Sequence, residues 1–322
     1  MAASKYPAFF AIFLGLGIAL AGCSKATDPW ENVPGGPTRV LVTIPPLYSL
    51  AKNVAGDDAA VLCLLGPHGP HGYESKMTPA DSLKAKKAHV FFAIGLGLDE
   101  WTQKILNSSG NKEKIKFVEV GEMAGAIKEE KDDKEEKGGH DHHHGDSDPH
   151  VWLGIPESIK MVNAIRDSLQ EIDPKNKDGY AKRAAAYVKE LEKLLADGKA
   201  ELKNKKNKKL IATHESLRYF GKSFGLEILD SIQPRPGIEA DSAKMTSLAK
   251  LMKEKDVRVI ATEPQYPHNL AEILKANLAK QKVEVKLVEI DPLETAPADE
   301  LDAGYYVKKM RDNITNLAKA LP

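Results

Sequence analysis

Aromatic side chains, net charge and cysteine are all scarce in this chain of 322 residues. Phe, Trp and Tyr make up 6% of the residues, and 46 basic side chains balance 46 acidic ones. A chain with zero net charge and few aromatic rings lacks the basic patches and stacking platforms of a nucleic-acid binder. The two cysteines, Cys23 and Cys63, are too few for a disulfide framework.

The N-terminus carries a long apolar run. Residues 8–21 are rich in Phe, Leu, Ile and Gly and follow a single basic residue. The run is too short for a permanent membrane span but suits the core of a signal peptide. It ends in Leu-Ala-Gly-Cys, which resembles the lipobox of bacterial lipoproteins. We therefore expect residues 1–22 to be removed, Cys23 to be lipidated, and residues 23–38 to tether the protein to a membrane outside the cytoplasm.

Short β-branched runs alternate with helical stretches along the rest of the chain. This pattern predicts βαβ units and a mostly parallel four-stranded sheet in each half. The eight runs are 39–44, 60–65, 89–94, 115–120, 210–213, 226–232, 257–262 and 283–290. Between the halves, apolar residues recur at steps of three and four from Tyr180 to Leu194, which predicts one long helix. We expect two similar α/β domains, 39–172 and 207–322, joined by a linker helix over 173–206.

A charged segment with four histidines interrupts the first half. Ten consecutive charged residues, 128–137, precede a tract made of His140, Asp141, His142, His143 and His144. Such a segment cannot bury apolar area, so we expect a surface loop over 128–147. Its imidazoles suit weak, auxiliary binding of a borderline metal such as zinc, while a solvated loop without function is the alternative.

Three further histidines and one aspartate stand where a parallel α/β fold builds its sites. His71, His214 and Asp291 each follow a predicted strand, and ligands bind beyond the carboxyl ends of such strands. His150 lies just ahead of a helical stretch. Because each half supplies two of the four, facing domains could complete one site in the cleft between them. Three imidazoles and one carboxylate form a tetrahedral zinc site.

The chain also resembles a known family over nearly its whole mature length. The matching pieces are Pro-His-Gly-Tyr-Glu at 70–74, the block 93–101, Asp-Pro-His-Val-Trp-Leu at 148–153, Thr-His at 213–214, Thr-Glu-Pro-Gln at 262–265, Ile-Asp-Pro-Leu at 290–293 and the closing helix. In these pieces it is similar to the cluster A-I metal receptors of bacterial ABC transporters, most closely the zinc-uptake receptors. The resemblance implies that His71, His150, His214 and Asp291 hold the metal. It also implies a monomer that works with a membrane permease and a cytoplasmic ATPase.

Two positions of this pattern stay open. Pro79 lies eight residues after His71, later than the family pattern has its proline, so either the loop carries an insertion or His68 is the first ligand. Glu263 also ends a predicted strand. We expect its carboxylate to orient a ligand imidazole, with direct ligation as the alternative.

The predicted function is extracytoplasmic capture of Zn²⁺ for an ABC permease. Manganese-type relatives usually carry Glu where this chain has His214, and the softer nitrogen favours zinc. The alternatives are a manganese or iron receptor of the same family and, less favoured, an envelope zinc hydrolase. We expect no enzyme, because His214-Glu215 lacks the second histidine of a zincin helix and four protein ligands leave no position for water. Affinity should fall as pH drops through about 6.5, since protons compete for imidazole.

Overall fold

The computed structural model describes residues 28–127, 147–233 and 240–322. The expected signal peptide, Cys23 and the histidine tract at 140–144 lie outside these residues. No helix within the described ranges is long and apolar enough to cross a membrane.

The described part of the expected tether packs against the N-terminal half. Trp30 is 4% exposed, and its Nε1 donates to the Lys84 carbonyl at 3.0 Å. Asp28 forms an ion pair with Lys87. A buried indole and an ion pair thus hold the part of the expected tether from Asp28 onward on the fold, and the tether over 23–38 stays a prediction.

The N-terminal half is built on a parallel sheet with the strand order β2-β1-β3-β4. The central strand β1 is buried at Val40, Leu41 and Val42, as expected of a strand covered on both faces. The strands are β1 (Thr38–Val42), β2 (Ala59–Cys63), β3 (Val90–Ala93) and β4 (Lys116–Glu119), and the helices that follow the first three are α1 (Pro45–Ala55), α2 (Pro79–Lys86) and α3 (Thr102–Ser109).

The C-terminal half repeats this arrangement with the strand order β6-β5-β7-β8. Every strand pair in both sheets is parallel. The strands are β5 (Lys209–Ala212), β6 (Glu227–Ser231), β7 (Val259–Thr262) and β8 (Lys286–Glu289), and the helices that follow the first three are α6 (Arg218–Phe224), α7 (Ser242–Glu254) and α8 (Asn269–Lys280). The eight runs read from the sequence are confirmed as the eight strands of two parallel sheets.

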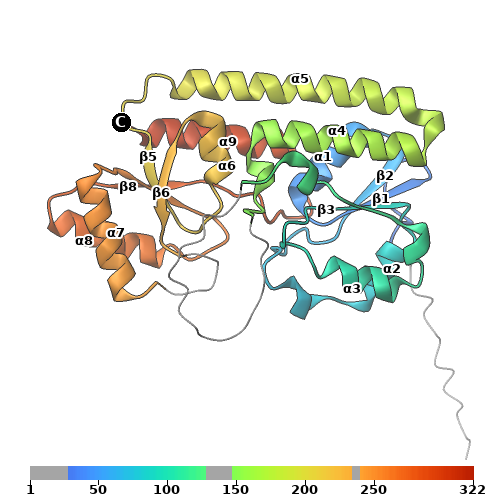
Figure 1. Cartoon of the computed structure of the whole chain (residues 1–322), viewed down its shortest axis with the longest axis horizontal. Helices are drawn as coiled ribbons and strands as arrows, with labels where there is room; N and C mark the ends of the chain where they lie inside the picture. The colour runs from blue at the N-terminus through green and yellow to red at the C-terminus, as the bar shows by residue number, and fades with distance from the viewer. Residues whose placement is uncertain (1–27, 128–146, 234–239) are drawn as a thin grey trace, which may run out of the picture.

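The predicted long helix is present as α5 (Lys177–Leu202), and it runs above both sheets beside α4 (Ile155–Ile172) (Figure 1). It begins later than residue 173, after a 3₁₀ turn over Pro174–Asn176. The carboxylate of Asp173 explains the delay. Its Oδ2 accepts hydrogen bonds from Thr38 Oγ1, Asn176 Nδ2 and Tyr180 OH at 3.0, 2.8 and 2.7 Å, which closes the turn before the helix starts.

Helix α9 (Tyr305–Ala320) connects the two halves. It follows the C-terminal sheet in sequence but packs on α1 and α5. Ser49 Oγ in α1 donates to the Ala303 carbonyl at 2.6 Å, and the Tyr306 hydroxyl donates to the Trp152 carbonyl at 2.6 Å. One hydrophobic cluster accordingly contains residues of both sheets. The division into 39–172, 173–206 and 207–322 stays a prediction, since the two sheets share this core.

Candidate metal centre

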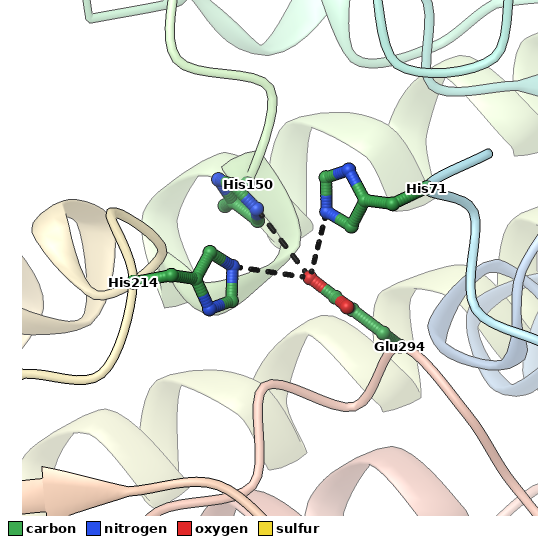
Figure 2. Close-up of side chains that lie close together, drawn as sticks. All are labelled: His71, His150, His214 and Glu294. Carbon is green, nitrogen blue, oxygen red and sulfur yellow. Dashed lines mark hydrogen bonds and ion pairs between the residues drawn. The ribbon is translucent and has the colours of Figure 1, made fainter. Parts of the chain in front are cut away.

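Four side chains from distant parts of the chain converge at the junction of the two halves. They are His71, His150, His214 and Glu294, and one ligand atom from each lies within 4.8 Å of all the others. Figure 2 shows the three imidazoles pointing at one oxygen of Glu294. The side chains of His150, His214 and Glu294 are 6%, 2% and 0% exposed, whereas that of His71 is 21% exposed.

The distances from Glu294 Oε1 to the three imidazoles suit a tetrahedral cation. Zinc bonds of about 2.0–2.1 Å at tetrahedral angles separate neighbouring ligand atoms by about 3.3–3.4 Å. Glu294 Oε1 lies 3.3 Å from His71 Nε2 and 3.5 Å from Nε2 of both His150 and His214. Within the described residues, Nε2 of His150 and of His214 is buried without a hydrogen-bond partner. A bound cation would give both of these buried nitrogens a partner.

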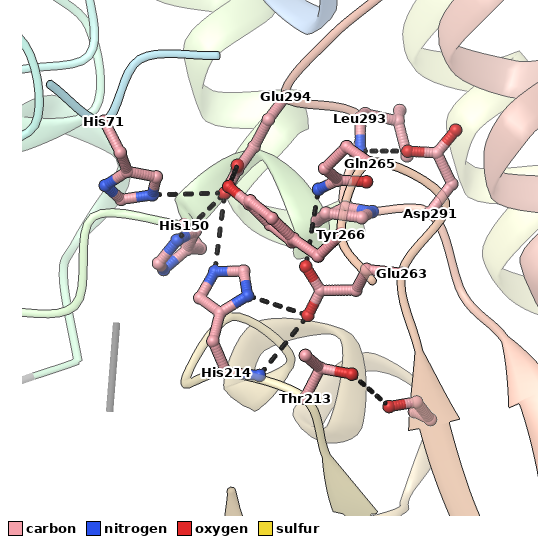
Figure 3. A network of polar contacts seen from close by, with 12 residues as sticks. His71, His150, Thr213, His214, Glu263, Gln265, Tyr266, Asp291, Leu293 and Glu294 are labelled. Carbon is pink, nitrogen blue, oxygen red and sulfur yellow. Dashed lines mark hydrogen bonds and ion pairs between the residues drawn. The ribbon is translucent and has the colours of Figure 1, made fainter. Parts of the chain in front are cut away.

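Carboxylates behind two of the imidazoles fix their orientation. Asp148 Oδ1 lies 2.8 Å from Nδ1 of His150, and Glu263 Oε1 lies 2.7 Å from Nδ1 of His214. A carboxylate at Nδ1 holds the proton of the neutral ring there and leaves the lone pair of Nε2 facing the centre. Figure 3 shows Glu263 behind His214, where the sequence predicted an orienting acceptor, and not among the four converging groups.

The chain holds each histidine by local structure. His71 lies in the loop after β2, between Gly66 and Gly72, which have φ values of +44° and +68°. His150 follows Asp148, whose carbonyl accepts a hydrogen bond from the Tyr219 hydroxyl at 2.8 Å. His214 lies two residues beyond the end of β5. His71 and His214 thus lie in turns after strands, and His150 lies at the start of a helix; the backbone changes direction sharply at each of these places.

The charges of the metal-free group are strongly coupled. Burial alone would raise the pKa of Glu294, but the close contacts of its carboxylate with the three imidazoles bring that pKa well below its ordinary value. Burial alone would lower the pKa of His214, but contacts with Glu263 and Glu294 raise it to about 10. The pKa of His150 is also raised, because Asp148 and Glu294 outweigh its burial. Protons therefore occupy this group when no cation does.

The structure corrects the fourth member of the expected set. Asp291 does not reach the three imidazoles: its Oδ1 accepts a hydrogen bond from Leu293 N at 2.8 Å, and its Oδ2 lies 3.4 Å from Lys309 Nζ. The turn that uses Asp291 in this way places Glu294, three residues later, at the centre (Figure 3). Sequence reasoning missed Glu294, although Asp-Pro-x is a signal for a turn in which the aspartate side chain bonds to the backbone and is therefore not free to bind a metal.

Two other sequence features take no part in the converging group. His68 is exposed, and His71 occupies the position for which His68 was the alternative. Residues 221–225 read Gly-x-Ser-x-Gly, the pattern of a hydrolase nucleophile elbow, which requires an exposed serine between a strand and a helix. Here Ser223 is buried within α6, and its Oγ accepts from Ile155 N at 3.1 Å. This motif supplies no nucleophile.

A cavity of about 900 Å³ borders the group on the side of His71. Its lining includes His68, His71, Tyr266 and His268. The Tyr266 hydroxyl also donates to Glu294 Oε2 at 3.3 Å, so the second oxygen of this carboxylate is held while the first faces the imidazoles. His71, the most exposed of the four side chains, lines this cavity, so this is the open side of an otherwise buried centre.

The fold and the centre together define a class of protein: a two-sheet α/β solute receptor with a buried metal-binding group. The family described as zinc-uptake complex component A, periplasmic, matches residues 40–320. The chain belongs to this family.

Individual relatives agree with this assignment. The zinc-binding lipoprotein AdcA of Streptococcus pneumoniae is 30% identical over 305 residues, which cover 92% of this chain and 58% of AdcA. The manganese-binding lipoprotein MntA of Halalkalibacterium halodurans is 25% identical over 262 residues, which cover 80% of this chain and 81% of MntA. The chain therefore spans 58% of the length of AdcA.

Solved structures share the architecture. The Mn²⁺ complex of FpvC from Pseudomonas aeruginosa superposes with a TM-score of 0.74 at 26% identity and covers 88% of this chain and 98% of FpvC. Zn(II)-bound AdcA superposes with a TM-score of 0.70 at 28% identity and covers 89% of this chain and 58% of that structure.

Proposed function

We propose that this protein captures Zn²⁺ outside the cytoplasm and delivers it, as a monomer, to an ABC permease driven by a cytoplasmic ATPase. The observation that carries the proposal is the convergence of three imidazole Nε2 atoms on Glu294 Oε1 at 3.3–3.5 Å in a buried place. His71, His150, His214 and Glu294 would be the ligands. The name of the relative AdcA, a zinc-binding lipoprotein, supports the same cation.

The second candidate is a manganese receptor on the same fold. The manganese-binding relative MntA and the Mn²⁺ complex of FpvC favour it. The ligand chemistry favours zinc, because Mn²⁺ prefers more and harder oxygen ligands, whereas three nitrogens and one oxygen suit tetrahedral Zn²⁺. Competition titration at one pH separates the two. We expect Zn²⁺ to displace bound Mn²⁺ completely, and tight Mn²⁺ binding that Zn²⁺ cannot displace would overturn the zinc assignment.

The number of protein ligands favours the role of a receptor over that of a zinc hydrolase. Four protein ligands close a tetrahedral site, and catalytic zinc keeps one position for water. Metal analysis of the purified protein tests the ligand set. Single alanine variants of the four residues should each lower the zinc content after dialysis, whereas His89→Ala, an imidazole beside β3, should retain one zinc per chain. Turnover of ester or peptide substrates by the zinc-loaded protein would favour the hydrolase.

The proposal includes two features outside the described residues. Lipidation of Cys23 would hold the receptor at a membrane, and Cys23→Ala should release it into the soluble fraction. The tract at 140–144 would bind zinc weakly beside the main centre. Deleting residues 128–145 should leave one tight site and abolish weaker ones, and loss of the tight site would show that the tract belongs to the main centre.

A further inference from the structure

Glu294 reaches the centre from a sharp turn after β8. The turn comprises residues 291–294, and Leu293 within it has φ of +63°. A branched residue in the left-handed region is uncommon and costs free energy, so surrounding contacts must hold it there. Leu293 directly precedes Glu294, and its backbone conformation therefore sets the direction in which the Glu294 side chain leaves the chain.

The Asp291 side chain makes the bond that closes this turn. Its Oδ1 accepts from Leu293 N at 2.8 Å, the hydrogen bond of an Asx turn. Its Oδ2 faces Lys309 Nζ at 3.4 Å, and Lys309 is also paired with Glu300. Both oxygens of Asp291 are thus engaged, and Figure 3 shows its bond to Leu293 on the side away from the imidazoles.

Two further side chains clamp the backbone of the same turn. Asn313 in α9 is 2% exposed; its Oδ1 accepts from Asp291 N at 2.8 Å, and its Nδ2 donates to the Asp291 carbonyl at 2.7 Å. Trp152, two residues after His150, donates from Nε1 to the Pro292 carbonyl at 2.7 Å. The turn is therefore held at three successive residues before Glu294, and one of the clamps belongs to the segment that carries another imidazole.

We propose that Asp291 is a positioning residue, whose carboxylate holds the turn that aims Glu294 at the three imidazoles without itself binding the cation. This inference rests on the proposed function, since it concerns the same centre. Without the bond to Asp291, nothing else bonds Leu293 N among the described contacts. Leu293 then relaxes to negative φ, and Glu294 turns away from the imidazoles. Asn313 supports the same turn from α9.

The test compares four variants of the full chain: Asp291→Ala, Asp291→Asn, Glu294→Ala, and the double variant Asp291→Ala with Glu294→Ala. Zinc affinity is measured by competition with a chelator, and the ligand field is read from the absorption of Co²⁺ placed in the same site. Asp291→Ala should weaken zinc binding by about 10- to 100-fold, as loss of an orienting group does. Its Co²⁺ spectrum should match that of Glu294→Ala. Asparagine keeps an acceptor for Leu293 N, so Asp291→Asn should restore most of the affinity and the native spectrum.

The double variant separates positioning from ligation. If Asp291 acts only through Glu294, removing it from the Glu294→Ala protein should change the zinc affinity by less than about twofold. A further loss in the double variant, or an Asp291→Asn protein as weak as Asp291→Ala, would overturn the proposal. So would an Asp291→Ala protein that binds zinc as the native protein does. If the native protein itself binds no zinc, the proposed function fails instead.

Asp28 offers a matched control. Its Oδ1 accepts from Trp30 N at 3.0 Å, two residues on, and its other oxygen pairs with Lys87, so it makes the same two contacts as Asp291 in the N-terminal half. Asp28→Ala should lower the midpoint of urea unfolding without changing the zinc affinity or the Co²⁺ spectrum. If Asp28→Ala weakened zinc binding as much as Asp291→Ala does, general loss of stability would explain both, and the positioning role would be refuted.

Discussion

Proton competition at the centre should make zinc binding pH-dependent well above the ordinary range of histidine. The perturbation is a change of pH from 8 to 6 at constant ionic strength. Contacts with Glu263 and Glu294 raise the pKa of His214 to about 10 in the metal-free protein. A protonated imidazole has no lone pair for a cation, so this proton must leave before His214 can bind zinc. The sequence alone predicted competition only below about pH 6.5.

The size of the effect follows from the interval between the pKa and the pH. At pH 7 the interval is about three units, which corresponds to a penalty of about 4 kcal/mol, or about 1000-fold in affinity. Each unit of pH should therefore change the zinc dissociation constant by about tenfold through His214 alone. His150, whose pKa is also raised, adds to the slope in the same direction.

Calorimetry in buffers of different ionisation enthalpy measures the protons released on binding. We expect at least about one proton per zinc at pH 7.5, and affinity that rises steadily from pH 6 to 8. Glu263→Gln removes one charge beside His214, so it should reduce the proton release at pH 8. His89→Gln lies outside the centre and should leave both quantities unchanged. Binding without proton release, with affinity constant over this range, would refute the reasoning.

Four other outcomes are expected. Protonated His214 should stabilise the metal-free protein, because the pKa of His214 is higher in the folded than in the unfolded protein. This stabilisation should be complete below pH 6.5 and lost as pH rises through about 10. Urea unfolding at several pH values measures it. Once proton competition at His214 is corrected for, Glu263→Ala should weaken zinc binding by about 10- to 100-fold in a chelator competition, because His214 loses its orienting acceptor. Zinc at 1000 times its dissociation constant should raise stability by about 4 kcal/mol in thermal unfolding, and a chelator should reverse the gain. Trp152→Phe should cost about 1–3 kcal/mol in urea unfolding, because the Pro292 carbonyl loses its donor.

Much of the fold could be predicted because it depends on local patterns. The part of the run 257–262 that forms β7 (Val259–Thr262) is mostly apolar and buried at every residue, as a strand covered on both faces of a parallel sheet requires. The buried face of α5, from Tyr180 to Leu194, follows the helical repeat. The packing of α9 on α1 could not be predicted in this way, since it depends on hydrogen bonds such as that between Ser49 and Ala303, about 250 residues apart in the chain.

The sequence by itself predicted the two sheets and the three histidines that converge. The apolar runs mark the strands, and each histidine lies after a predicted strand or just ahead of a helix. Only the tertiary structure decided the fourth side chain. Asp291 and Glu294 both follow β8 within five residues, and either carboxylate could join three imidazoles on chemical grounds. The choice depends on one backbone angle at Leu293 and on the contacts that hold it, from Asp291 within the turn and from Asn313 and Trp152 far along the chain. The backbone conformation of Leu293 sets the direction in which Glu294 leaves the chain, and its free-energy cost is offset by the local bond to Asp291 together with contacts from Asn313 and Trp152 that exist only in the folded protein.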